Sequence, residues 1–140
     1  MDLLERARRF IAVIPHCTAL GITVQDVGLG RATLALPYDI RLIGDPATGV
    51  IAGGAVSVLL DSAASAAVMA HPEARGVTAT IDLRVDYLRA ATPGQTVVAE
   101  AECYHVTQHV AFVRAKTHDD DTGRPVAVAT GTFTILREGT

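Results

Sequence analysis

Residues 53–69 read GGAVSVLLDSAASAAVM, and this run determines how the rest of the chain must be arranged. Ala and Leu dominate it and no Pro interrupts it, which favours an α-helix ended by His71 and Pro72. The run is apolar nearly all round, so the helix must be buried on most of its sides. The wider stretch from Thr48 to Ala70 has almost the length of a membrane span. Asp61 lies near its middle, however, where an unpaired charge costs about 2.5 to 3.5 kcal/mol, so burial by protein explains the run better than a membrane does.

The next stretch has a period of two. From Val77 to Tyr87, apolar residues at odd positions alternate with Thr, Asp and Arg at even positions. Side chains alternate between the faces of a strand, so the pattern predicts a long strand whose odd-numbered residues form one apolar face. Turn residues divide the remaining sequence into further elements. These are an amphipathic helix with Leu3, Ala7, Phe10 and Ile14 on one side, ended by Pro15; strands at 20–27 and 31–37, turned at 28–30; a loop with turn residues at 44–49; and strands at 96–107, 110–117 and 126–136, the last two joined by a polar hairpin turn at 119–123.

The order of these elements predicts an α+β fold. Consecutive strands joined by short turns imply an antiparallel sheet, and a sheet needs its apolar face covered. A single sheet wrapped around the long central helix meets both requirements, with residues 1–140 forming one domain. One chain would still leave apolar surface at the sheet edges and along the helix. We therefore expect self-association, as a homodimer or a dimer of dimers.

The composition excludes several classes of function. The 140 residues carry a net charge of −3 with scattered basic side chains, whereas nucleic-acid binding needs a concentrated positive surface. Cys17 and Cys103 are too few for a disulfide framework and lack metal-ligand spacing, so we expect two reduced cysteines in a cytosolic protein. The charged N-terminus does not have the pattern of a signal peptide, which also predicts a cytoplasmic location.

Two features of the central helix suggest chemistry. Asp61 lies in its most apolar part and must be paired, protonated or placed at an opening, unless a helix cap or a bond to Ser57 or Ser65 satisfies it. Gly53 and Gly54 begin the helix, where unpaired N–H groups stabilise a developing negative charge, although the pair could serve only as a tight turn into the helix. Asp61 follows Gly53 by eight residues, roughly 12 Å along a helix axis. The two could act on one carbonyl only if different subunits supplied them.

Ile51-Ala52-Gly53-Gly54, followed by Leu59-Leu60-Asp61, resembles the signature of hotdog thioesterases of the PaaI type. In that family, a His-Gly-Gly at the start of the helix precedes a catalytic Asp at this spacing. The resemblance covers about residues 20–136 and implies a hotdog fold, hydrolysis of acyl-CoA to free acid and CoA, and no metal or organic cofactor. Its other matches are Gly44-Asp45-Pro46, Thr48-Gly49-Val50, VDYLRA at 85–90 and ATGTF at 129–133.

The resemblance also implies roles for single residues. The Gly53 amide would form an oxyanion hole that polarises the thioester carbonyl, and Asp61 of the partner subunit would activate water or attack directly. Thr80 falls where the family often has a hydroxyl that orients the water. Arg89 could bind CoA phosphates, unless it is a solvated charge at the end of a strand. The remaining substrate contacts are expected from Asp45, which lies near a loop position where relatives carry Asn, and from Ala52, Gly54, Ser65 and Tyr87.

One departure from the family pattern supports an alternative function. Ala52 replaces the family's His, which favours a hotdog protein that binds acyl-CoA without hydrolysing it. A purely structural, oligomerising domain is a third interpretation, but it leaves Asp61 and the Gly pair unexplained. His118 and the following Asp residues are expected to form a polar hairpin tip rather than a metal site. The lack of a His placed near an Asp on the central helix argues against a hotdog dehydratase or hydratase.

Overall fold

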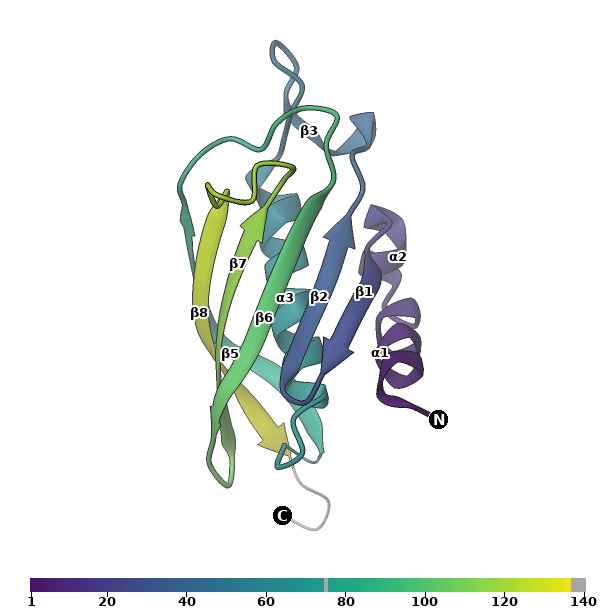
Figure 1. Ribbon diagram of the computed structural model, residues 1–140, viewed down its shortest axis with the longest axis vertical. Coiled ribbons are helices and arrows are strands. Elements are labelled where there is room, and N and C mark those ends of the chain that lie inside the picture. The colour runs from purple at the N-terminus through teal and green to yellow at the C-terminus, as the bar shows by residue number, and fades with distance from the viewer. Residues whose placement is uncertain (75, 137–140) are drawn as a thin grey trace.

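The computed structural model describes residues 1–74 and 76–136. Its elements are α1 (Leu3–Ala12), α2 (Pro15–Leu20), β1 (Thr23–Gly28), β2 (Arg31–Leu36), β3 (Ile43–Asp45), β4 (Val50–Ile51), α3 (Gly53–Met69), β5 (Val77–Tyr87), β6 (Val97–Val106), β7 (Val110–His118) and β8 (Ala127–Leu136). Six strands form one antiparallel sheet in the order β1-β2-β6-β7-β8-β5, while β3 and β4 pair separately. Helix α3 lies against one face of the sheet, and α1 and α2 lie beside β1 (Figure 1). The predicted α+β hotdog fold is confirmed.

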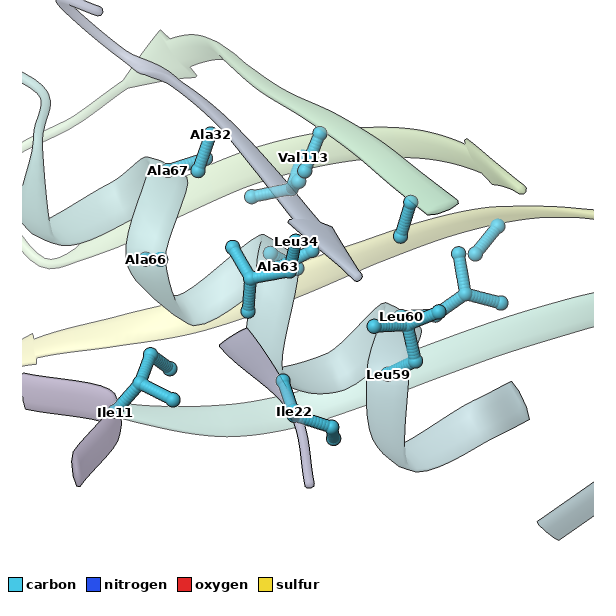
Figure 2. Packing of buried hydrophobic residues seen from close by; sticks show 14 of the residues in the cluster. Ile11, Ile22, Ala32, Leu34, Leu59, Leu60, Ala63, Ala66, Ala67 and Val113 are labelled. Atoms are coloured by element: carbon cyan, nitrogen blue, oxygen red, sulfur yellow. The ribbon is translucent and has the colours of Figure 1, made fainter. Parts of the chain in front are cut away.

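The core is built from small and branched side chains. Ala63 and Ala67 of α3 are fully buried, which lets the sheet approach the helix closely. Leu34 of β2 and Val113 of β7 pack over the helix from the sheet, with Ile11 of α1 nearby (Figure 2). None of the helices in the described ranges has both the length and the hydropathy to cross a membrane.

The predicted boundaries are correct for the two longest elements, and those predicted near the N-terminus of the chain are wrong. Helix α3 and strand β5 begin and end where the sequence predicts. The strand expected from residue 20 begins only at Thr23, because the short helix α2 occupies residues 15–20. Helix α1 already ends at Ala12, before Ile14 and Pro15, which were expected to be its last residue and its stop. Pro15 instead starts α2, since a helix tolerates Pro at its first position. Gly21 then ends α2 in the left-handed conformation, with φ of 75°. The loop expected at 44–49 is only partly correct, because residues 44 and 45 belong to β3 and only residues 46–49 form the turn that joins β3 to β4.

Strand β5 contains a β-bulge, so the prediction of one apolar face made of odd-numbered residues is wrong. The pairing with β8 shifts by one residue at Ile81. Before the bulge, Thr80 lies opposite the buried Phe133; after it, Tyr87 lies opposite the buried Ala127. Residues directly opposite each other in a sheet share a face. The bulge therefore turns both Thr80 and Tyr87 toward α3, although one is even-numbered and the other odd-numbered.

Gly131 of β8 accommodates this bulge. A Cβ atom at Gly131 would lie 2.6 Å from the carbonyl oxygen of Asp82 and 2.9 Å from a methyl group of Leu83. Real Cβ atoms do not approach other atoms so closely, so only glycine fits here. The Asp82 carboxylate also accepts hydrogen bonds from the backbone N–H and the hydroxyl of Thr132, which ties the bulged strand to β8.

Candidate functional site

Asp61 is held from the sheet rather than from its own helix. The Thr80 hydroxyl on β5 donates a hydrogen bond of 2.7 Å to Asp61 Oδ1. Ser57, one turn before Asp61, instead donates to the Gly54 carbonyl at 3.0 Å, so the interpretation in which Ser57 satisfies Asp61 is wrong. Asp61 is only partly buried, and its carboxylate lies where α3 meets β5. Asp61 and Thr80 are both candidates from the sequence, and the structure places them in contact.

The N-terminus of α3 presents two amides to solvent. Gly53 and Gly54 are both exposed, and in the described part of the chain no side chain caps this end of the helix. The first N–H groups of a helix have no acceptor within it and carry the positive end of its dipole. The third amide, that of Ala55, bonds to the Ala52 carbonyl at 3.0 Å. The Gly53 and Gly54 amides are therefore well placed to bind a negatively charged oxygen.

Tyr87 adjoins this helix end. Its hydroxyl donates a hydrogen bond to the Gly53 carbonyl at 2.8 Å. Its ring packs against Gly53, with a ring carbon 3.3 Å from the position that a Cβ atom of residue 53 would occupy. Beside it lies an open pocket of about 280 Å³, lined by Gly53, Tyr87, Arg89 and otherwise by Val, Ile, Leu and Ala side chains. The pocket combines an apolar wall with an amide donor, which suits an acyl or thioester group.

Arg89 is neither solvated nor free. It forms two hydrogen bonds of 2.8 Å with the carboxylate of Asp119, whose side chain is fully buried, while Arg89 itself is 18% exposed. The guanidinium also donates to the Arg124 carbonyl, and the Thr92 N–H donates to Asp119. The interpretation of Arg89 as a solvated charge is wrong. Asp119 therefore neutralises the charge of Arg89, which also lines the pocket. A contact between Arg89 and CoA phosphates stays an untested prediction.

The ion pair has a pH-dependent effect on stability. The Arg89 guanidinium holds the pKa of Asp119 well below its usual range. We expect Asp119→Asn to lower the free energy of unfolding by about 2 kcal/mol at neutral pH, because the change removes the ionic part of the pair. Since folding depresses the pKa of Asp119, its contribution exists above the ordinary Asp pKa of about 4 and is lost as pH falls below that value. Urea unfolding of both proteins at neutral pH and near pH 3 measures the difference, which should shrink in acid.

A matched control lies on the same hairpin. Asp121 pairs with Arg124 in the solvent, so Asp121→Asn makes the same charge change and should alter stability little at either pH. A loss for Asp119→Asn that is no larger than this control, or that stays constant with pH, would contradict the assignment of the buried pair.

The other candidate residues divide between the two ends of α3. Asp45 is the exposed last residue of β3, and its carboxylate accepts hydrogen bonds from the Ala47 N–H at 3.0 Å and the Thr48 hydroxyl at 2.8 Å in the turn that follows. Ala52 precedes the Gly pair and packs against Gly44, at which a Cβ would lie 2.7 Å from the Ala52 Cα. Ser65 is partly buried and lies one turn beyond Asp61.

One chain does not bring all of these groups to one point. Asp61 and Thr80 meet at the middle of α3, whereas Gly53, Gly54 and Tyr87 meet at its N-terminus. Asp61 is eight positions after Gly53, a rise of roughly 12 Å along the helix. A thioester carbonyl could not contact both groups of a single chain.

The cysteines and the hairpin after β7 lie apart from these candidate residues. Within residues 1–74 and 76–136, no cluster of three His, Cys, Asp or Glu side chains could hold a metal ion. Cys17 and Cys103 are free and buried, and Cys17 lies 3.2 Å from the Ser62 hydroxyl. The expected polar hairpin tip is present at residues 120–123, but Asp119 at its start is buried.

The structural roles of Gly131 and Asp119 were not predicted from the sequence. Gly131 stands between Thr residues in a strand, and an isolated glycine in a strand pattern is a signal for a bulge or a close backbone approach. Asp119 is the first of three consecutive Asp residues, and nothing in that run distinguishes the buried one.

Comparisons with known proteins identify the family of this chain. The pattern of the thioesterase superfamily matches residues 48–126. YigI of Salmonella typhimurium, a medium/long-chain acyl-CoA thioesterase, is 28% identical over 139 residues, which cover 90% of this chain and 88% of YigI. A Pseudomonas aeruginosa protein of known crystal structure is 40% identical with a TM-score of 0.86, covering 96% of this chain and all 100% of that one. The phenylacetic acid degradation protein PaaI of Thermus thermophilus, solved as a mutant, is 30% identical with a TM-score of 0.76, covering 87% and 99% of the two chains. This chain therefore belongs to the thioesterase superfamily, as a hotdog thioester hydrolase of the PaaI type.

Proposed function

We propose that this protein hydrolyses acyl-CoA thioesters to free acid and CoA at a site shared between two subunits. The Gly53 amide of one subunit would bind the carbonyl oxygen, and Asp61 of the partner subunit would act as general base or nucleophile. Thr80 would hold the Asp61 carboxylate and orient the water. Ala52, Gly54, Ser65, Asp45 and Tyr87 complete the expected surroundings of the substrate, with no metal or organic cofactor.

The observation that carries this proposal is the hydrogen bond between Thr80 and Asp61. Asp61 lies in the most apolar stretch of the chain and is only partly buried; among the described residues, one hydroxyl holds its carboxylate through one oxygen. A carboxylate with only a structural role would be expected to be fully paired, as Asp119 is. Asp61 is instead oriented and accessible, which is what a general base needs.

A shared site requires a dimer, and β5 offers the surface for it. Strand β5 lies at one edge of the sheet, where a second chain can pair with its unused backbone groups. Val77 and Ile81 are 69% and 53% exposed on this strand, and Leu136 of neighbouring β8 is 61% exposed. We propose that a second copy of this chain covers these side chains, as a homodimer or within a dimer of dimers of single-domain chains. The cytoplasmic location expected from the sequence stays a prediction.

A mixture of two inactive subunits tests the shared site. Asp61→Asn removes the base, and Gly53→Pro removes the amide donor. A mixed dimer has one site with both defects and one site with neither, so we expect purified mixed dimers to show about half of the wild-type kcat. The two chains are co-expressed with different affinity tags, and free-thiol release is measured with short-chain, medium-chain and aryl-acetyl CoA esters.

Two results would contradict the proposal. Mixed dimers as inactive as a preparation of two differently tagged Asp61→Asn chains would show that the groups do not act together across an interface. A wild-type protein that binds the esters but releases no thiol from any of them would favour the rival, a non-catalytic acyl-CoA-binding protein. The observation that favours this alternative is Ala52, which stands where the family has His.

A further inference from the structure

Tyr87 contacts the first peptide group of α3 through both its ring and its hydroxyl. The hydroxyl donates to the Gly53 carbonyl at 2.8 Å, and the ring carbons lie 3.3 and 3.4 Å from where a Gly53 Cβ would be. Tyr87 reaches this position because the bulge at Ile81 turns the end of β5 toward the helix. The contact therefore depends on a specific irregularity of the sheet.

The bonded carbonyl belongs to the same peptide group as the Gly54 amide. A peptide group is planar, with its C=O and N–H pointing in opposite directions, so a bond that fixes the Gly53 oxygen also fixes the direction of the Gly54 N–H. A hydrogen bond accepted by the oxygen also polarises the group and makes its N–H a stronger donor. The Gly54 N–H is one of those that find no acceptor within the helix.

Gly54 is exposed at this point, and no described neighbour explains the absence of a side chain. An ideal Cβ at Gly54 would meet no described atom within 4 Å, in contrast to Gly53 and Gly131. Glycine near a helix end costs stability relative to alanine, so the open space beside the Gly54 backbone needs another reason. Close approach of a substrate to the Gly54 amide supplies one.

We propose that Tyr87 is a positioning residue that orients and polarises the Gly53–Gly54 peptide, making the Gly54 amide a second donor to the thioester carbonyl oxygen beside that of Gly53. This inference rests on the proposed thioesterase function. Tyr87 acts through the backbone, and it need not touch the substrate's reacting atoms.

Tyr87→Phe tests the proposal because it removes the hydroxyl and keeps the ring. We expect kcat to fall about tenfold, less than for the loss of a whole oxyanion-hole donor, while KM changes little. The direct readout is the infrared carbonyl stretch of octanoyl-CoA labelled at its carbonyl carbon, bound to a protein that also carries Asp61→Asn to slow turnover. Tyr87→Phe should shift this band to higher frequency, because a weaker donor polarises the carbonyl less.

Ser57→Ala is the matched control. The Ser57 hydroxyl donates to the next carbonyl, that of Gly54, whose peptide group carries the Ala55 N–H. That N–H already bonds to the Ala52 carbonyl, so it is not available to a substrate. Ser57→Ala removes an equivalent hydrogen bond but should leave kcat and the carbonyl band unchanged. Equal effects of the two variants would mean a general loosening of the helix end and would overturn the proposal.

A second substitution covers the case in which Tyr87→Phe does not fold. Site-specific 3-fluorotyrosine at position 87 keeps the shape but donates more strongly, so the carbonyl band should move to lower frequency. If the wild-type protein hydrolyses acyl-CoA but neither substitution at position 87 moves the carbonyl band, only the proposed role of Tyr87 is overturned. A wild-type protein that neither binds nor hydrolyses any acyl-CoA would instead overturn the proposed function.

Discussion

Gly53→Pro should lower kcat by roughly a hundredfold to a thousandfold while leaving the fold intact, which is the range for removal of one oxyanion-hole donor. Proline fits the first position of a helix because the amide it lacks has no acceptor there. The residue before a proline must be extended, and Ala52 already has φ of −58° and ψ of 137°. The substitution thus removes one N–H group at a backbone that is already compatible with it. Steady-state thiol release gives kcat, and thermal unfolding reports whether the fold is retained.

Gly53→Ala separates the amide from the added side chain. Both substitutions place a Cβ about as close to the Tyr87 ring, at 3.3 Å, but only alanine keeps the N–H. We expect the alanine variant to retain most of its kcat. If both variants lost activity equally, the cause would be displacement of Tyr87, and the Gly53 amide would not be the donor. If neither lost activity, the carbonyl oxygen would be bound elsewhere.

The elements that the sequence predicted best are those with a continuous local pattern. Residues 53–69 hold no helix breaker, and residues 77–87 alternate without interruption, so the limits of α3 and β5 follow from local sequence. The face on which each β5 side chain lies does not follow from local sequence. It depends on Gly131, which lies far along the chain and becomes a neighbour of Asp82 only when β5 and β8 pair. A pattern confined to one strand cannot report a bulge that its partner strand makes possible.

The same distinction applies to the candidate site. Asp61 was detectable because a carboxylate in an apolar helix is anomalous, and the Gly pair because it begins that helix. The partners of these groups were not detectable from spacing alone, since Thr80 and Tyr87 differ in parity and strict alternation would place them on opposite faces. The ion pair between Arg89 and Asp119 joins residues 30 positions apart and needs the folded hairpin to form.

The bulge in β5 links the fold to the proposed chemistry. Without it, a strand that turned Thr80 toward Asp61 would turn Tyr87 away from Gly53. With it, one strand supports both the carboxylate at the middle of α3 and the amides at its N-terminus. Because β5 is also the exposed edge of the sheet, the strand that orients these groups is the one that a second subunit would meet. In a site shared across this edge, β5 of each subunit would position the groups that its own α3 contributes.

Asp61→Asn should lower kcat by about a hundredfold or more, the scale expected when a catalytic base is lost. Asn has the size of Asp, and its side-chain oxygen can still accept the hydrogen bond from Thr80, which measures 2.7 Å with Asp61 in place. KM should therefore change little. Thiol release from the best ester of the panel gives both constants, and unfolding measurements show whether the variant is folded.

Asp26→Asn is a suitable control for the charge change. Asp26 is an exposed carboxylate on β1, at the opposite edge of the sheet from β5, so its substitution removes the same charge without approaching the proposed site. We expect its kcat to equal that of the wild type. An Asp61→Asn protein that kept more than about a tenth of the wild-type kcat would exclude Asp61 as base or nucleophile. The Thr80–Asp61 hydrogen bond would then be a structural link between α3 and the edge strand, and the base would have to come from another residue at the interface.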